Sequence, residues 1–205
     1  LTLPATAALL VIAMPIVTVL FERGAFGPAE TRATADALMA FATGLPAYVL
    51  IRVLTPGFFA REDTSTPVRI AAAGIMVNIL LNLFLMELWG HVGIALASSV
   101  AAWVNAAALA VVLKRRGQFS IDARLTQRGP KIALASAGMA AGLLGLERLM
   151  AAAYAGPYVA NIFALALLIF GGVLMFGGLA HVLGAVHWSD LTALRRRRNE
   201  ELGDA

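Results

Sequence analysis

The segment that decides the fold class is residues 68–113, VRIAAAGIMVNILLNLFLMELWGHVGIALASSVAAWVNAAALAVVL. It contains two apolar runs, 68–89 and 92–113, separated only by Gly90 and His91. Each run has the roughly 20 residues that a helix needs to cross a hydrocarbon core of about 30 Å. A segment in lipid must satisfy its own backbone, and the ten-residue alternation of barrel strands is absent. Both runs are therefore predicted to be membrane helices.

The rest of the chain follows the same pattern. Of its 205 residues, 60% are hydrophobic and 14% are charged, whereas soluble domains have about 45–50% and about 25%. Four further apolar runs bring the predicted spans to six: 1–21, 35–60, 132–149 and 158–186. We therefore predict an all-α, polytopic membrane helical bundle. This composition excludes an ordinary soluble enzyme, a disordered chain and a nucleic-acid-binding domain.

Basic residues give the orientation of the six predicted spans. Of the 16 Lys and Arg residues, twelve fall on one side of the membrane and three on the other, with Arg52 inside a span. Because Lys and Arg accumulate on the cytoplasmic side, both ends of the chain are predicted to be cytoplasmic. The only long polar connection, 114–131, divides the chain. We predict a four-helix part (1–113), a cytoplasmic basic loop (114–131), an appended helix pair (132–186) and a cytoplasmic basic tail (187–205).

Motifs for catalysis and for metal binding are missing. The sequence has no HExxH, GxSxG, P-loop or GxGxxG at a strand–helix junction, and it has no cysteine. The three histidines, His91, His181 and His187, lie at or near span ends without metal-ligand spacing. We predict no enzyme activity, no metal and no cofactor.

Arg52 is the most informative residue, because it lies inside the second predicted span, about 12 Å from its cytoplasmic end. A cation at such a position costs on the order of 2.5–3.5 kcal/mol on insertion scales unless it reaches water. Either Arg52 faces a polar cavity and meets an anionic headgroup, or its long side chain extends to the cytoplasmic interface.

Amides mark the third and fourth predicted spans. Asn78 and Asn82 are four residues apart and so share one helical face. Asn105 lies in the next span, after Ser98 and Ser99. These side chains either line a polar cavity or form hydrogen bonds between helices, and the second is the commoner arrangement.

Residues 44–67, GLPAYVLIRVLTPGFFAREDTSTP, carry a more specific pattern. A basic residue precedes a Pro-Gly-aromatic-aromatic helix end, and Arg-x-Asp-x-x-Thr-Pro opens the next helix. This pattern resembles the MurJ (MviN) family of lipid II flippases, within the multidrug/oligosaccharidyl-lipid/polysaccharide exporter superfamily. The residues that carry it are Pro56, Gly57, Arg61, Asp63, Thr66 and Pro67.

The resemblance implies a function and a place within a longer protein. Members of this family have fourteen spans, and the six here look like spans nine to fourteen. The implied activity moves lipid II, the undecaprenyl-linked peptidoglycan precursor, to the outer leaflet of the bacterial cytoplasmic membrane. The implied partners are lipid II, membrane lipids and a coupling ion or the membrane potential, with no nucleic acid. In this family the last two spans form a groove for the lipid tail.

The loop between the second and third predicted spans is open to two interpretations. As a tight junction, Thr64 or Thr66 caps the next helix and Pro67 occupies its first position. Asp63 then accepts hydrogen bonds from free backbone amides, and Arg61 pairs with it or with lipid phosphate. The alternative is a solvated charged turn.

Two rival functions remain open at the level of sequence. The first is another exporter of the same superfamily, such as a drug/cation antiporter or a polysaccharide flippase. The second is a membrane scaffold that transports nothing and only binds a partner.

Overall fold

The computed structural model describes residues 2–117, 123–150 and 158–184, and every regular element in these ranges is a helix. The predicted all-α class is confirmed. The helices are α1 (Thr2–Phe21), α2 (Pro28–Ala42), α3 (Leu45–Leu54), α4 (Pro56–Phe59), α5 (Ser65–Arg115), α6 (Ala123–Met150) and α7 (Tyr158–Val182).

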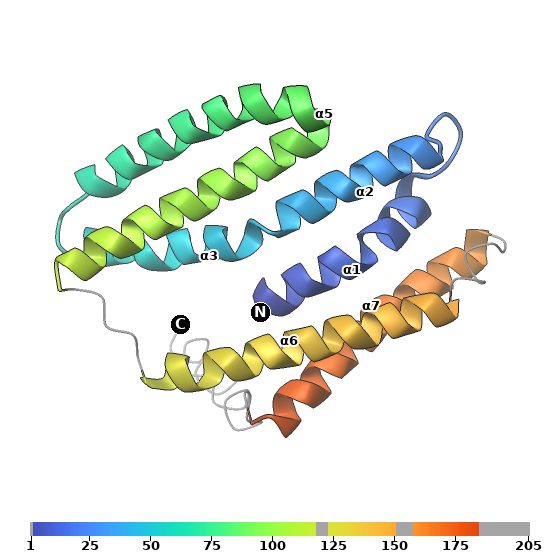
Figure 1. The fold of residues 1–205 in the computed structure, drawn as a ribbon. Helices are drawn as coiled ribbons and strands as arrows, with labels where there is room; N and C mark the ends of the chain where they lie inside the picture. The colour runs from blue at the N-terminus through green and yellow to red at the C-terminus, as the bar shows by residue number, and fades with distance from the viewer. Residues whose placement is uncertain (1, 118–122, 151–157, 185–205) are drawn as a thin grey trace, which may run out of the picture.

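Among the described residues, five helical segments are long and apolar enough to cross a membrane. The longest, α5, is a hairpin, because its chain reverses at Gly90, whose φ of 56° and ψ of −130° are not helical (Figure 1). A positive φ of this kind is strained for residues that carry a Cβ. Each limb of α5, 65–89 and 91–115, exceeds the about 20 residues that a span requires.

The second predicted span, 35–60, is in fact three consecutive helices. It begins earlier than predicted, at Pro28, and it is interrupted at residues 43–44 and again at Thr55. Pro46 and Pro56 each lie in the first turn of the helix that follows an interruption. Proline has no N–H to donate and a fixed φ, so it fits a first turn and cannot continue the helix before it.

The helices lie in layers, with α1 near the middle (Figure 1). On one side α1 contacts α2 and α3, which in turn contact the α5 hairpin; on the other it contacts α6 and α7. Small residues form much of the inner contact, including Ala13 against Ala35 and Ala47 against Ala102 and Ala106. Because lipid is as apolar as these side chains, close packing by small residues is what holds such helices together.

The appended pair forms a tight helical hairpin of its own. A Cβ on Gly142 would lie 2.7 Å from the Met175 sulfur, and one on Gly138 would lie 2.9 Å from Leu179. The GxxxG spacing of these glycines therefore marks the face of α6 that contacts α7.

Helix α6 begins at Ala123, well before the predicted start at residue 132. Much of the predicted basic loop, 114–131, is therefore helical, because α5 also continues to Arg115. Ala, Leu, Gln and Arg in this stretch are favourable helix formers, so α6 can begin before its hydrophobic run does. The centre of that loop, 118–122, and the predicted tail, 187–205, lie outside the described residues.

Candidate functional site

A cavity of about 250 Å³ lies between α3 and the two limbs of α5. Two of the three predicted asparagines, Asn78 and Asn105, line it from opposite limbs. Gly74 lies against the second amide, since a Cβ there would be in ordinary van der Waals contact with the Asn105 side chain at 3.5 Å. The other lining residues are Tyr48 and Ile51 of α3 and Ala71, Ile75, Ser98, Ala101 and Ala102 of α5.

Hydrogen bonds connect one wall of this cavity. Asn82 Nδ2 donates to Asn78 Oδ1 at 2.7 Å, and Asn78 Nδ2 donates to Ser98 Oγ at 3.3 Å. The pair Asn78 and Asn82 therefore both hydrogen-bonds along its own face and links the two limbs. The buried Oδ1 of Asn82 accepts no hydrogen bond within the described ranges. Both uses of amides that the sequence left open, cavity lining and interhelical bonding, occur in the same cluster.

Arg52 is not part of this cavity. Its side chain is exposed on α3, one residue beyond Ile51, and it pairs with no other described residue. An arginine inside a span must reach water, phosphate or a group from another segment. The structure thus separates the predicted cation from the predicted amides.

The loop motif has a defined geometry. Asp63 N donates to Phe58 O at 3.2 Å and Glu62 N donates to Phe59 O at 3.0 Å, while Glu62 has a φ of 59°. This pair of bonds with one left-handed residue is the usual way of ending a helix, although the left-handed residue is normally glycine. It ends α4 and places Asp63 two residues before the start of α5 at Ser65.

Asp63, not Thr64 or Thr66, caps α5. Its Oδ1 accepts from Thr66 N at 3.0 Å, whereas Thr64 at the N-cap position forms no side-chain cap bond. The sequence predicts Pro67 at the first helical position, but α5 begins at Ser65. Since the carboxylate can satisfy the amide of Thr66 directly, the helix starts before the proline.

Arg116, from the far end of α5, pairs with Asp63 in place of the predicted Arg61. Its Nη1 donates to Asp63 Oδ2 at 2.6 Å, and its Nη2 donates to Thr66 Oγ1 at 3.2 Å. The guanidinium also lies 5.7 Å from the ring centroid of Phe58, a geometry suited to a cation–π contact. No local sequence pattern indicates this pairing, because 53 residues separate the partners.

These contacts set the ionisation of Asp63. The Arg116 guanidinium, and after it the hydroxyl and amide of Thr66, hold the pKa of the Asp63 carboxyl far below its usual value. A carboxylate stabilised in this way contributes to folding above its unfolded pKa of about 3.9, and the contribution is lost as the pH falls through the folded value.

We therefore expect the stabilisation by Asp63 to be constant at neutral pH and to decline in acid. The melting temperature of wild type should exceed that of Asp63→Asn at pH 7, and the difference should shrink below about pH 4. The measurement is thermal unfolding of the purified protein between pH 3 and pH 7. Glu62→Gln, which removes the neighbouring charge, is the matched control. An equal loss in both variants at pH 7 would contradict a specific role for Asp63.

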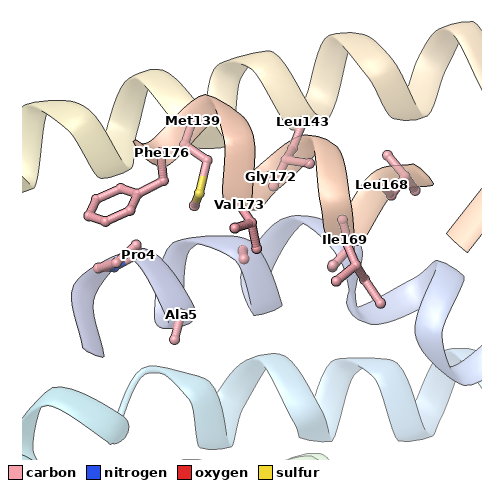
Figure 2. A pocket seen from close by; sticks show the side chains of 11 residues that line it. Pro4, Ala5, Met139, Leu143, Leu168, Ile169, Gly172, Val173 and Phe176 are labelled. Atoms are coloured by element: carbon pink, nitrogen blue, oxygen red, sulfur yellow. The ribbon is translucent and has the colours of Figure 1, made fainter. Parts of the chain in front are cut away.

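A second cavity, of about 300 Å³, lies between α1, α6 and α7. Figure 2 shows Met139, Ile169 and Val173 directed toward α1, which contributes Pro4 and Ala5. Leu143 and Leu168, both fully buried, also line it and belong to one core cluster with Ile12. Its lining is apolar throughout, so it suits an alkyl or isoprenoid chain and not a charged group.

The chain matches a family model described as "Lipid II flippase MurJ" over residues 1–183. It is 49% identical over 143 residues to a "Probable lipid II flippase MurJ" of Rhizobium meliloti (strain 1021), covering 70% of this chain and 27% of that protein. A protein of the same description in Rickettsia prowazekii (strain Madrid E) is 35% identical over 193 residues, covering 94% and 38%. The chain thus spans well under half the length of these curated relatives.

A solved structure has the same fold. It is described as "Lipid II flippase MurJ, inward closed conformation", and it covers 89% of this chain and 36% of its own, with a TM-score of 0.66 at 23% identity. The family model extends through all the long helices, from α1 to α7, and is not confined to the loop motif. This chain is therefore a member of the MurJ family of lipid II flippases.

Proposed function

We propose that this chain is the C-terminal part of a flippase that moves lipid II from the inner to the outer leaflet of the bacterial cytoplasmic membrane. The observation that carries the proposal is the family match over residues 1–183. The presence of one cavity with an apolar lining and another with polar side chains supports it. No bond is made or broken in such transport, so no residue is assigned a catalytic role.

The apolar cavity between α1, α6 and α7 is the place proposed for part of the undecaprenyl tail. Burial of each methylene contributes about 0.8 kcal/mol in water, but in a bilayer the tail is already in an apolar solvent. The cavity therefore serves to guide the tail by shape, and it does not need to bind it tightly. The division into a four-helix part and an appended pair is part of this proposal.

The charged headgroup needs a polar route across the membrane. We assign Arg52 to that route, because it is a cation on the exposed surface of α3 without a described partner. The route would open alternately to each side, driven by an ion gradient or the membrane potential acting on two bundle arrangements of different stability.

The test is to deplete the full-length protein in cells and to measure how much lipid II becomes accessible to an externally added, impermeant modifying enzyme. Loss of accessible lipid II, restored by the wild-type gene, is the expected result. Unchanged accessibility after depletion, with another lipid-linked glycan trapped inside, would contradict lipid II as the substrate.

The proposed orientation gives a separate prediction. The chain has no cysteine of its own, so a thiol reagent can label it only at the cysteine that is introduced. Cysteines within 114–131 and after residue 195 should be shielded from an impermeant thiol reagent in intact cells, whereas cysteines near Gly27 and Gly156 should be labelled. Permeabilised cells provide the control, in which all four sites react. Labelling of the 114–131 segment from outside would contradict the predicted orientation.

A further inference from the structure

The interruption between α2 and α3, residues 43–44, leaves backbone groups without helical partners. Gly44 N donates to Phe41 O at 3.0 Å, three residues back, and so does not reach Ala40 O. Pro46 has no N–H to donate. This joint lies within a segment that crosses the membrane, where no lipid group can replace the missing partners.

Two side chains of the second α5 limb donate hydrogen bonds to backbone carbonyls at this joint. Ser99 Oγ donates to Ala40 O at 2.7 Å, and Trp103 Nε1 donates to Thr43 O at 3.0 Å. These donors are one helical turn apart, so one face of α5 presents both of them. Ser99 is only 1% exposed, which makes its hydrogen bond a buried interhelical contact.

The backbones also approach closely at the joint. A Cβ on Gly44 would lie 2.7 Å from Ser99 Oγ and 3.0 Å from Ser99 Cα. Only glycine fits this contact without displacing backbone, so the joint and α5 are held together by shape as well as by hydrogen bonds.

We infer that Ser99 and Trp103 are positioning residues, which fix the direction of α3 relative to the α5 hairpin. This inference rests on the proposed function, because its consequence is for transport. Neither residue lines the polar cavity, but each directly follows a lining residue in the chain, Ser98 and Ala102 respectively. Tyr48, four residues after Gly44, is the first α3 residue in the lining, and its hydroxyl donates to Ser98 O at 3.5 Å.

Freeing the joint would therefore move Tyr48 and Ile51 away from the amides of α5. The same movement would displace Arg52, which has no partner within the described residues to hold it in place. The two donors thus control the shape of the cavity and the position of the cation without contacting either.

The test is the double variant Ser99→Ala/Trp103→Phe in the full-length protein. The Thr43 hydroxyl still donates to Ala40 O at 2.7 Å, and phenylalanine keeps an aromatic ring in place, so the protein should still fold. The matched control is Ser136→Ala/Trp89→Phe. Ser136 is a buried serine that bonds within its own helix, and Trp89 is an exposed tryptophan on the first limb.

The direction of α3 is read from the distance between two nitroxide labels, at cysteines replacing Val53 of α3 and Leu88 of α5. Both positions are exposed, at 67% and 58%. Double electron–electron resonance spectroscopy should give one narrow distribution of label distances in the wild-type background and in the control. The double variant should give a broadened or shifted one. Lipid II transport per folded protein should fall by about tenfold, as expected for two interhelical hydrogen bonds in a membrane.

An unchanged distance distribution in the double variant would overturn the inference. So would a changed distribution with transport at the wild-type level, since the direction of α3 would then not matter. If the unmutated protein moves no lipid II at all, the proposed function fails, while the label distances still decide whether the joint is held by these two donors.

Discussion

Gly93→Ala should prevent the α5 hairpin from closing, with a large loss of folded protein. Gly93 is buried three residues after the reversal at Gly90, and a Cβ there would collide with the Leu85 carbonyl of the opposite limb. A backbone oxygen cannot rotate aside as a side chain can, so the two limbs must separate. We expect destabilisation beyond the about 1–3 kcal/mol that is typical of overpacking. The measurement is the melting temperature of the detergent-solubilised protein, together with its yield.

Gly145→Ala is the matched control for this variant. Gly145 lies in α6, and a Cβ there would meet nothing within 4 Å. Alanine is a better helix former than glycine, so this change should stabilise the helix by about 0.5–1 kcal/mol. Equal melting temperatures for Gly93→Ala and Gly145→Ala would show that the hairpin tolerates a wider separation.

Arg52→Ala should abolish transport in the full-length protein while membrane levels stay normal. The side chain is exposed and has no polar partner in the described part of the chain, so its removal deletes no hydrogen bond or ion pair there. If anything, folding should improve, since an arginine within a span costs on the order of 2.5–3.5 kcal/mol on insertion scales. Loss of transport with unchanged or higher stability is the signature of a cation kept for its substrate.

Two further variants make the Arg52 result specific. Arg52→Lys should retain much of the activity, because an ammonium also meets a phosphate as a point charge. Arg69→Ala removes an equal charge from an exposed position at the predicted cytoplasmic start of α5, and it should leave transport near the wild-type level. Wild-type transport by Arg52→Ala would show that the side chain only extends to the interface.

The Asp63 contacts show how far local sequence reasoning reaches. That a carboxylate directly before a helix accepts an amide of its first turn follows from the loop sequence alone, and Asp63 accepts from Thr66 N. The residue that pairs with the Asp63 carboxylate could not be predicted from the loop sequence. Arg61 and Arg116 are equally basic in the sequence, and only the return of the α5 hairpin brings Arg116 to within 2.6 Å of Asp63.

The second predicted span shows that helix interruptions are equally hard to predict from local sequence. Pro46 and Pro56 indicate where a continuous helix is costly, but a proline within a span is compatible with a kink, an interruption or neither. In α1, Pro15 lies inside an uninterrupted helix. Before Pro46 the helix ends, and the second limb of α5 supplies donors to the carbonyls at that point.

The sequence by itself determined the helical class, the membrane environment and the family, because length, apolarity and a contiguous motif are properties of short stretches of chain. The tertiary structure decided which polar groups meet. Asn78 and Asn105 share a cavity, Arg52 lies outside it, and Ser99 and Trp103 bond a helix end about 60 residues earlier. The physical reason is that lipid fixes each span separately, through backbone hydrogen bonding and length. The rotation and register of one span against another depend on close packing and a few interhelical bonds, and no single stretch of sequence contains both partners.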